Sequence, residues 1–228
     1  MNNAPEIDLY CERLTSAWFD EPLGLISNLA FLIAALQLAR HPGNRWPQWV
    51  LIGLLSCIGI GSGLFHAFAT RLTLLLDVIP IQLFILTAIW IVLRLHLLRT
   101  HWQSALILIG FLCASALMPT GVFNGSLGYV PAWVMLVILA MAHPIGPARQ
   151  WLVTAAAVFP VSLAFRTADL PVCHLWPYGT HFVWHLLNAY VLYCVIRATQ
   201  TGVAANDIPL GGPELSAYTS DDNKERTP

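Results

Sequence analysis

Seven long apolar segments constrain this chain more than any other feature of its sequence. Each approaches the roughly 20 residues that a helix needs to cross a bilayer. Only helices and closed barrels span lipid, and these segments lack the alternation of barrel strands. The sequence therefore predicts an all-α membrane protein, a bundle of seven transmembrane helices. Their approximate bounds are Leu23–Ala39, Gln48–His66, Leu72–Leu93, Trp102–Leu117, Tyr129–His143, Trp151–Phe165 and His181–Ile196.

The composition agrees with an integral membrane protein. Hydrophobic residues make up 57% of the chain and charged residues only 10%, whereas about a quarter of a soluble domain is charged. A net charge of −1 without a basic patch excludes nucleic acid as a partner. The polar, acidic start of the chain lacks the features of a cleaved signal peptide, so we expect the first membrane helix to direct insertion.

The basic residues predict an orientation and a domain organisation. With the N-terminus outside, only Arg13, Arg71 and Arg166 fall on the outer side, which follows the positive-inside rule. We expect an extracytoplasmic segment at residues 1–22, a membrane domain at 23–198 and a disordered cytoplasmic tail at 199–228. Short loops favour a bacterial inner membrane with the site on the periplasmic side, and an organelle membrane is the alternative. The basic residues predicted inside are Arg40, Arg45, Arg94, Arg99, Arg149, Arg197, Lys224 and Arg226.

Polar residues at the outer ends of three segments form the candidate site. Ser62 and His66 end the second segment, Asp77 begins the third, and His181 and His185 begin the last. The predicted orientation places all of them on the same side of the membrane. We therefore expect these segments to meet there.

The histidines predict a metal site. His181 and His185 are four positions apart, so one helical face carries both rings. His66 supplies a third nitrogen if its helix packs beside the last one. Three protein ligands leave a fourth zinc position open for a water whose pKa falls to about 7. The plain alternative is that these histidines only hydrogen-bond to headgroups or backbone.

Ser62 and Asp77 complete a candidate hydrolytic site. Ser62 lies one turn before His66 and could donate a hydrogen bond to an oxyanion. Asp77 could take a proton from water and pass it to a leaving amine. The alternatives are that Ser62 is a small packing residue among Gly59, Gly61 and Gly63, and that Asp77 is a structural partner of Arg71.

The chain resembles the alkaline ceramidases, which belong to the CREST group of seven-helix membrane hydrolases. The resemblance rests on the Ser-x-x-x-His of residues 62–66, Asp77, the His-x-x-x-His of residues 181–185, and an N-terminal pattern that includes Tyr10-Cys11-Glu12, Glu21 and Ser27-Asn28. It covers nearly all of residues 8–197. It implies zinc on the three histidines, catalytic roles for Ser62 and Asp77, and hydrolysis of an N-acyl sphingoid lipid to a fatty acid and a free base.

The resemblance also implies a calcium ion held by the N-terminal segment. The matching residues are Asp8, Glu12 and Glu21, and carboxylates suit a hard cation. The chain departs from the family pattern at Leu9 and Leu14. The alternative to a calcium site is an acidic N-terminal segment that is simply exposed to solvent.

Two cysteines outside the predicted membrane segments suggest a crosslink. A disulfide between Cys11 and Cys173 would fasten the N-terminal segment to the loop before the last helix. Two free thiols are the alternative. Arg166 and Asp169 fall in the same outer loop, where we expect them to pair and shape it rather than to contact a headgroup.

Three classes of function fit these residues. The first is a zinc-dependent amide hydrolase whose partner is a ceramide-like membrane lipid. The second is a related membrane hydrolase acting on another amide or ester lipid. The third is a non-catalytic receptor or transporter with a structural metal, which has no need for Asp77 and Ser62 beside an open zinc position. No protein partner is evident from the sequence.

Overall fold

A computed structural model describes residues 7–15, 17–119 and 121–201, and every regular element within these ranges is a helix. This confirms the all-helical prediction for the described part of the chain. The elements are α1 (Pro22–Ser27), α2 (Leu29–Ala39), α3 (Trp46–Phe68), α4 (Arg71–Ile91), the π-helix η1 (Val92–His96), α5 (His101–Ala116), the short 3₁₀-helix η2 (Ser126–Tyr129), α6 (Val130–Ala142), α7 (Pro147–Val172) and α8 (His181–Thr201).

Five stretches of the described chain are long and apolar enough to cross a membrane, namely Pro22–Ala39, Trp46–Phe68, Arg71–His96, Pro147–Val172 and His181–Thr201. The helices His101–Ala116 and Ser126–Ala142 are apolar but shorter. Large apolar side chains stay exposed along α4, including Leu72, Leu75, Ile79 and Leu83. Such a surface suits contact with lipid and is compatible with a multi-pass membrane protein.

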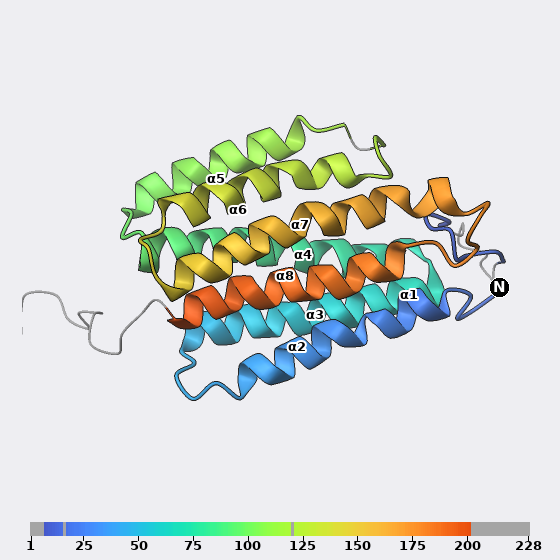
Figure 1. The fold of residues 1–228 in the computed structure, drawn as a ribbon, viewed down its shortest axis with the longest axis horizontal. Helices are drawn as coiled ribbons and strands as arrows, with labels where there is room; N and C mark the ends of the chain where they lie inside the picture. The colour runs from blue at the N-terminus through green and yellow to red at the C-terminus, as the bar shows by residue number, and fades with distance from the viewer. Residues whose placement is uncertain (1–6, 16, 120, 202–228) are drawn as a thin grey trace, which may run out of the picture.

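The long helices run side by side in one elongated bundle (Figure 1). Helix α8 packs against α7 and α2, α3 packs against α4 and α2, and α6 packs against α7. The N-terminal segment lies at the end of the bundle where α7 ends and α8 begins, and the end of α8 lies at the opposite end (Figure 1). One end of the bundle therefore gathers the start of the described chain and the loop between α7 and α8.

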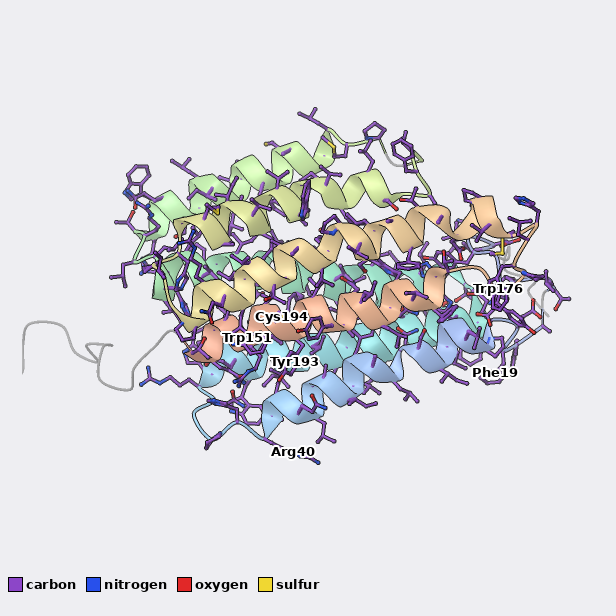
Figure 2. The ribbon with its side chains drawn as sticks, viewed as in Figure 1. Phe19, Arg40, Trp151, Trp176, Tyr193 and Cys194 are labelled. Atoms are coloured by element: carbon purple, nitrogen blue, oxygen red, sulfur yellow. A yellow bond between two sulfur atoms is a disulfide. The ribbon has the colours of Figure 1, made fainter. Side chains whose placement is uncertain are left out.

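Aromatic and basic side chains mark the two ends of this bundle. Figure 2 shows Phe19 and Trp176 at the end that carries the N-terminal segment, with Arg40 and Trp151 toward the other. Phe19 and Trp176 are exposed. Exposed aromatic residues at such positions are typical of a membrane–water interface.

Several predicted boundaries differ from the observed ones. The first predicted helix divides at Asn28, whose side-chain amide donates to the Gly24 carbonyl at 2.7 Å and so competes with the backbone ladder. The sixth predicted helix continues through Pro160 to Val172, so Arg166 and Asp169 lie in α7 and not in a loop. Helix α8 extends to Thr201, which places residues 199–201 in a helix. The rest of the predicted tail, 202–228, lies outside the described residues.

Candidate metal centre and adjoining cavity

Helices α3 and α8 bring three histidines together at the end of the bundle that carries the N-terminal segment. His66 comes from the last turn of α3, and His181 and His185 come from the first turns of α8. All three are buried, and ligand nitrogens from the three rings lie within 4.8 Å of one another. Nε2 of His66 is 3.2 Å from Nε2 of His185. This is the only group of at least three metal-ligating side chains among the described residues.

The spacing of these nitrogens suits one metal ion. Two nitrogens bound to a tetrahedral zinc at about 2.0–2.1 Å lie about 3.3 Å apart, close to the observed 3.2 Å between His66 and His185. The far nitrogens of His66 and His185 are already engaged. Nδ1 of His66 contacts the Glu21 carboxylate, and Nδ1 of His185 lies 2.7 Å from the Ser27 hydroxyl. Partners of this kind fix the orientation of metal-ligating histidines, so the residues present fit a bound ion.

His181 is oriented by its surroundings in a different way. The Tyr10 ring stacks on the His181 ring with the centroids 3.6 Å apart. The Asp169 carboxylate accepts hydrogen bonds from the backbone N–H groups of Thr180 and His181, at 2.7 and 2.9 Å. Nδ1 of His181 is buried without a hydrogen-bond partner among the described residues. A buried ring nitrogen without a partner is costly unless a ligand satisfies it.

A close crossing of α3 and α4 places Ser62 beside Asp77. A Cβ added to Gly61 would lie only 2.0 Å from the Leu76 carbonyl oxygen, so no larger residue fits there without moving a helix. Ser62 and Asp77 are the next residues on each helix, and both side chains line one polar cavity. The structure therefore brings both predicted catalytic residues to one place, and it makes Gly61 a positioning residue.

Two cavities meet at this site. The polar one is lined by Ser62, Asp77, Arg166, His181 and His185, together with Tyr10 and other side chains. The second cavity has an almost entirely apolar lining and shares Ile58, Ile81, Tyr129 and Asn188 with the first. Its lining runs along α4 to the first residue of η1, from Ile81 to Val92, a distance of about 16 Å. The polar site thus adjoins an elongated apolar cavity inside the bundle.

The three acidic residues predicted to bind calcium are not brought together as a ligand group. Asp8 is exposed. The Glu12 carboxylate accepts hydrogen bonds from the N–H groups of Leu23 and Gly24, both at 2.7 Å, at the start of α1. Burial raises the pKa of Glu12 and outweighs these two donors.

Whereas the Glu12 carboxylate is bonded to the start of α1, Glu21 contacts the histidine cluster. One carboxylate oxygen accepts from Nε of Arg13 at 2.5 Å, and the other contacts Nδ1 of His66. Burial raises the pKa of Glu21 to about 7, and the Arg13 charge opposes that rise. Glu21 is therefore placed to support His66, and calcium binding at this segment stays a prediction.

The predicted disulfide is present. Cys11 and Cys173 are joined by an S–S bond that links the N-terminal segment to the end of α7. The same junction is held by the Asp169 carboxylate, which accepts a hydrogen bond from the Cys11 backbone N–H at 3.0 Å. Crosslink and hydrogen bond together hold Tyr10, which precedes Cys11, against His181.

Sequence reasoning missed the supporting residues Arg13, Ser27, Arg166 and Asp169 as parts of the site. A signal for three of them was available, because serine, arginine and aspartate are costly within helices of a membrane protein and mark functional positions. Arg13 had no such signal. Its guanidinium donates to the His66 carbonyl at 3.1 Å, a contact that depends on how the N-terminal segment folds back.

No protein-family model matches the chain, and no curated protein matches it significantly.

Proposed function

We propose that this protein is a zinc-dependent intramembrane amide hydrolase that cleaves the N-acyl bond of ceramide-like lipids to a fatty acid and a sphingoid base. One observation carries the proposal. Ser62 and Asp77 are both buried and line the same cavity as His181 and His185. A structural metal site has no use for such a pair, whereas hydrolysis needs a group that moves a proton and a donor to an oxyanion.

The residues divide the chemistry among them. A zinc ion held by His66, His181 and His185 would supply a water with its pKa lowered to about 7. Asp77 takes the proton of the attacking water and returns it to the amine nitrogen as the C–N bond breaks. The Ser62 hydroxyl donates a hydrogen bond to the carbonyl oxygen of the amide and stabilises its developing charge. Glu21 and Ser27 hold two of the imidazole rings throughout.

The apolar cavity would bind the acyl chain of the substrate. An extended chain advances about 3.3–3.6 Å for every three backbone bonds, or about 1.2 Å per bond. The stretch of about 16 Å along α4 and the start of η1 matches the extended length of roughly a dozen carbons. An amide at the junction of the two cavities has its acyl chain among Ile85, Ala88 and Leu136 and its carbonyl beside the histidines.

A bundle of seven membrane spans, with the N-terminus and the site on the outer side, belongs to the same proposal. Such a placement puts the site at headgroup depth. A lipid then reaches the site while its second chain stays in the bilayer. A bacterial inner membrane with a periplasmic site suits this arrangement.

Hydrolysis of a lipid panel by the purified, metal-replete protein tests the function. Ceramides are compared with ester lipids of the same acyl chain, with release of fatty acid as the readout. We expect turnover of the amides, and Asp77→Asn should lower kcat by about 10²- to 10⁴-fold while one metal ion per chain stays bound. Full activity of Asp77→Asn would remove Asp77 from the mechanism. No turnover of any amide or ester would favour a receptor or transporter.

A further inference from the structure

Arg166 is a charged residue of the polar cavity that the proposed chemistry does not use. It comes from α7 and lines the polar cavity together with Asp77 and His181. Three aromatic rings surround its guanidinium carbon, which lies 5.8 Å from the centre of the Tyr10 ring, 5.4 Å from Tyr129 and 5.6 Å from Trp184. Its Nη1 donates to the Tyr10 hydroxyl at 3.3 Å.

This guanidinium is an incompletely paired cation. Among the described residues, no carboxylate oxygen lies within 4.0 Å of it. Its Nε is buried and has no hydrogen-bond partner there. Asp169, one turn further along α7, is occupied by three backbone N–H groups. Aromatic rings stabilise a buried guanidinium only in part, and an anion that accepts its remaining N–H groups stabilises it far more.

The position of Arg166 along α7 indicates which half of an amide substrate would contact its guanidinium. Leu152 and Phe159 of the same helix line the apolar cavity, and Arg166 lies seven residues, or about 10 Å, beyond Phe159 toward the end that carries the N-terminal segment. An acyl chain in the apolar cavity points away from Arg166. The amine half of the same amide lies on the Arg166 side.

We propose that Arg166 selects substrates whose amine half carries an anionic group, a carboxylate, phosphate or sulfonate next to the scissile amide. The inference rests on the proposed function and narrows its substrate class to N-acyl lipids with an anionic amine half, so that neutral ceramides are turned over less efficiently than such lipids. A guanidinium presents its donors in a planar fork that matches two oxygens of such a group. The Tyr10, Tyr129 and Trp184 rings hold this fork in place before the substrate arrives.

A matched pair of substrates tests the effect of a negative charge on the amine half. N-dodecanoylglycine and N-dodecanoylethanolamine have the same acyl chain and amine halves of nearly the same size, but one ends in a carboxylate and the other in a hydroxyl. We expect the wild-type kcat/KM to be about 10- to 100-fold higher for the glycine amide, the range of a charge-assisted hydrogen bond. Equal values, or a preference for the neutral amide, would overturn the inference. Dodecanoyl amides of aminoethyl phosphate and taurine then rank phosphate and sulfonate against carboxylate.

Variants assign the preference to Arg166. Arg166→Gln should lose about 10-fold or more in kcat/KM for the glycine amide and change by less than about 3-fold for the neutral one. Arg166→Lys should keep part of the preference, since it keeps the charge but not the fork. Arg71→Gln removes an exposed cation near the same end of the bundle and should change neither value. An equal loss for both amides in Arg166→Gln would contradict substrate selection.

A binding measurement separates this inference from the proposed function. The rise in Tm caused by each amide is measured in the Asp77→Asn background, with and without Arg166→Gln. We expect the glycine amide to stabilise the protein more, and Arg166→Gln to abolish the difference. That result without any turnover would reject the hydrolase and keep the anion site. Turnover of both amides with equal stabilisation would keep the hydrolase and reject the anion site.

Discussion

Nε2 of His66 lies 3.2 Å from Nε2 of His185, although 119 positions separate the two residues in the sequence. Neither ring is held by its own helix alone. Glu21 contacts the far nitrogen of His66, and Ser27 contacts the far nitrogen of His185. The site therefore depends on three parts of the chain, α3, α8 and the short region around α1.

Removal of one of these rings should remove the metal. We expect His185→Ala to lose bound zinc and activity together, because two remaining imidazoles hold the ion far more weakly than three. Metal content per chain, measured after purification and dialysis, checks this. His174→Ala is the control, since His174 is exposed and lies outside the histidine group. Stoichiometric zinc in His185→Ala would contradict the ligand assignment.

Ser27 should tune metal affinity without being a ligand. Its hydroxyl lies 2.7 Å from Nδ1 of His185, and loss of a partner of this kind lowers metal affinity by about 10- to 100-fold. We expect Ser27→Ala to show that loss in a competition titration with a chelator while the protein remains folded. Ser56→Ala is the control, because the Ser56 hydroxyl donates only to the Ile52 carbonyl within α3. The metal affinity of Ser56→Ala should match that of the wild type. Equal metal affinities of Ser27→Ala and Ser56→Ala would show that Ser27 does not tune metal binding.

Residue types and spacing were enough to predict the histidine cluster and the disulfide partners. His181 and His185 share a helical face by their spacing alone, and His66, Ser62 and Asp77 stand out because polar residues are costly at the ends of apolar segments. Cys11 and Cys173 were predicted from the topology, which placed both on the same side of the membrane. Each of these inferences needs only the order of the helices.

The supporting contacts could not be predicted because they depend on rotation and on exact helix ends. Hydropathy ended the sixth predicted helix at Phe165, since Arg166 and Asp169 are charged. The helix continues because Asp169 accepts backbone N–H groups inside the protein and Arg166 lies among aromatic rings. Glu21 was assigned to calcium by resemblance, and only the fold-back of the N-terminal segment places it on His66.

Gly61 should be intolerant of any side chain. A methyl group there would lie 2.0 Å from the Leu76 carbonyl oxygen, so Gly61→Ala forces α3 and α4 apart next to Ser62 and Asp77. We expect a loss of about 1–3 kcal/mol in stability and a fall in kcat, since overpacking costs this much even where the structure adjusts. Gly53→Ala on the same helix is the matched control, because a methyl group there meets nothing within 4 Å. Wild-type melting and activity in Gly61→Ala would contradict the close crossing.

Asp169 should stabilise the junction from which His181 is positioned. Its buried carboxylate accepts the backbone N–H groups of Cys11, Thr180 and His181, and Asp169→Ala leaves all three without this partner. Since each unsatisfied buried donor costs about 1–3 kcal/mol, we expect the loss to exceed about 3 kcal/mol and Tm to fall by more than about 5 °C. Asp20→Ala is the control, because that carboxylate also accepts two backbone N–H groups but does so at the surface. Both variants are compared with the disulfide intact. If the Tm of Asp169→Ala is as high as that of Asp20→Ala, the disulfide alone holds the junction.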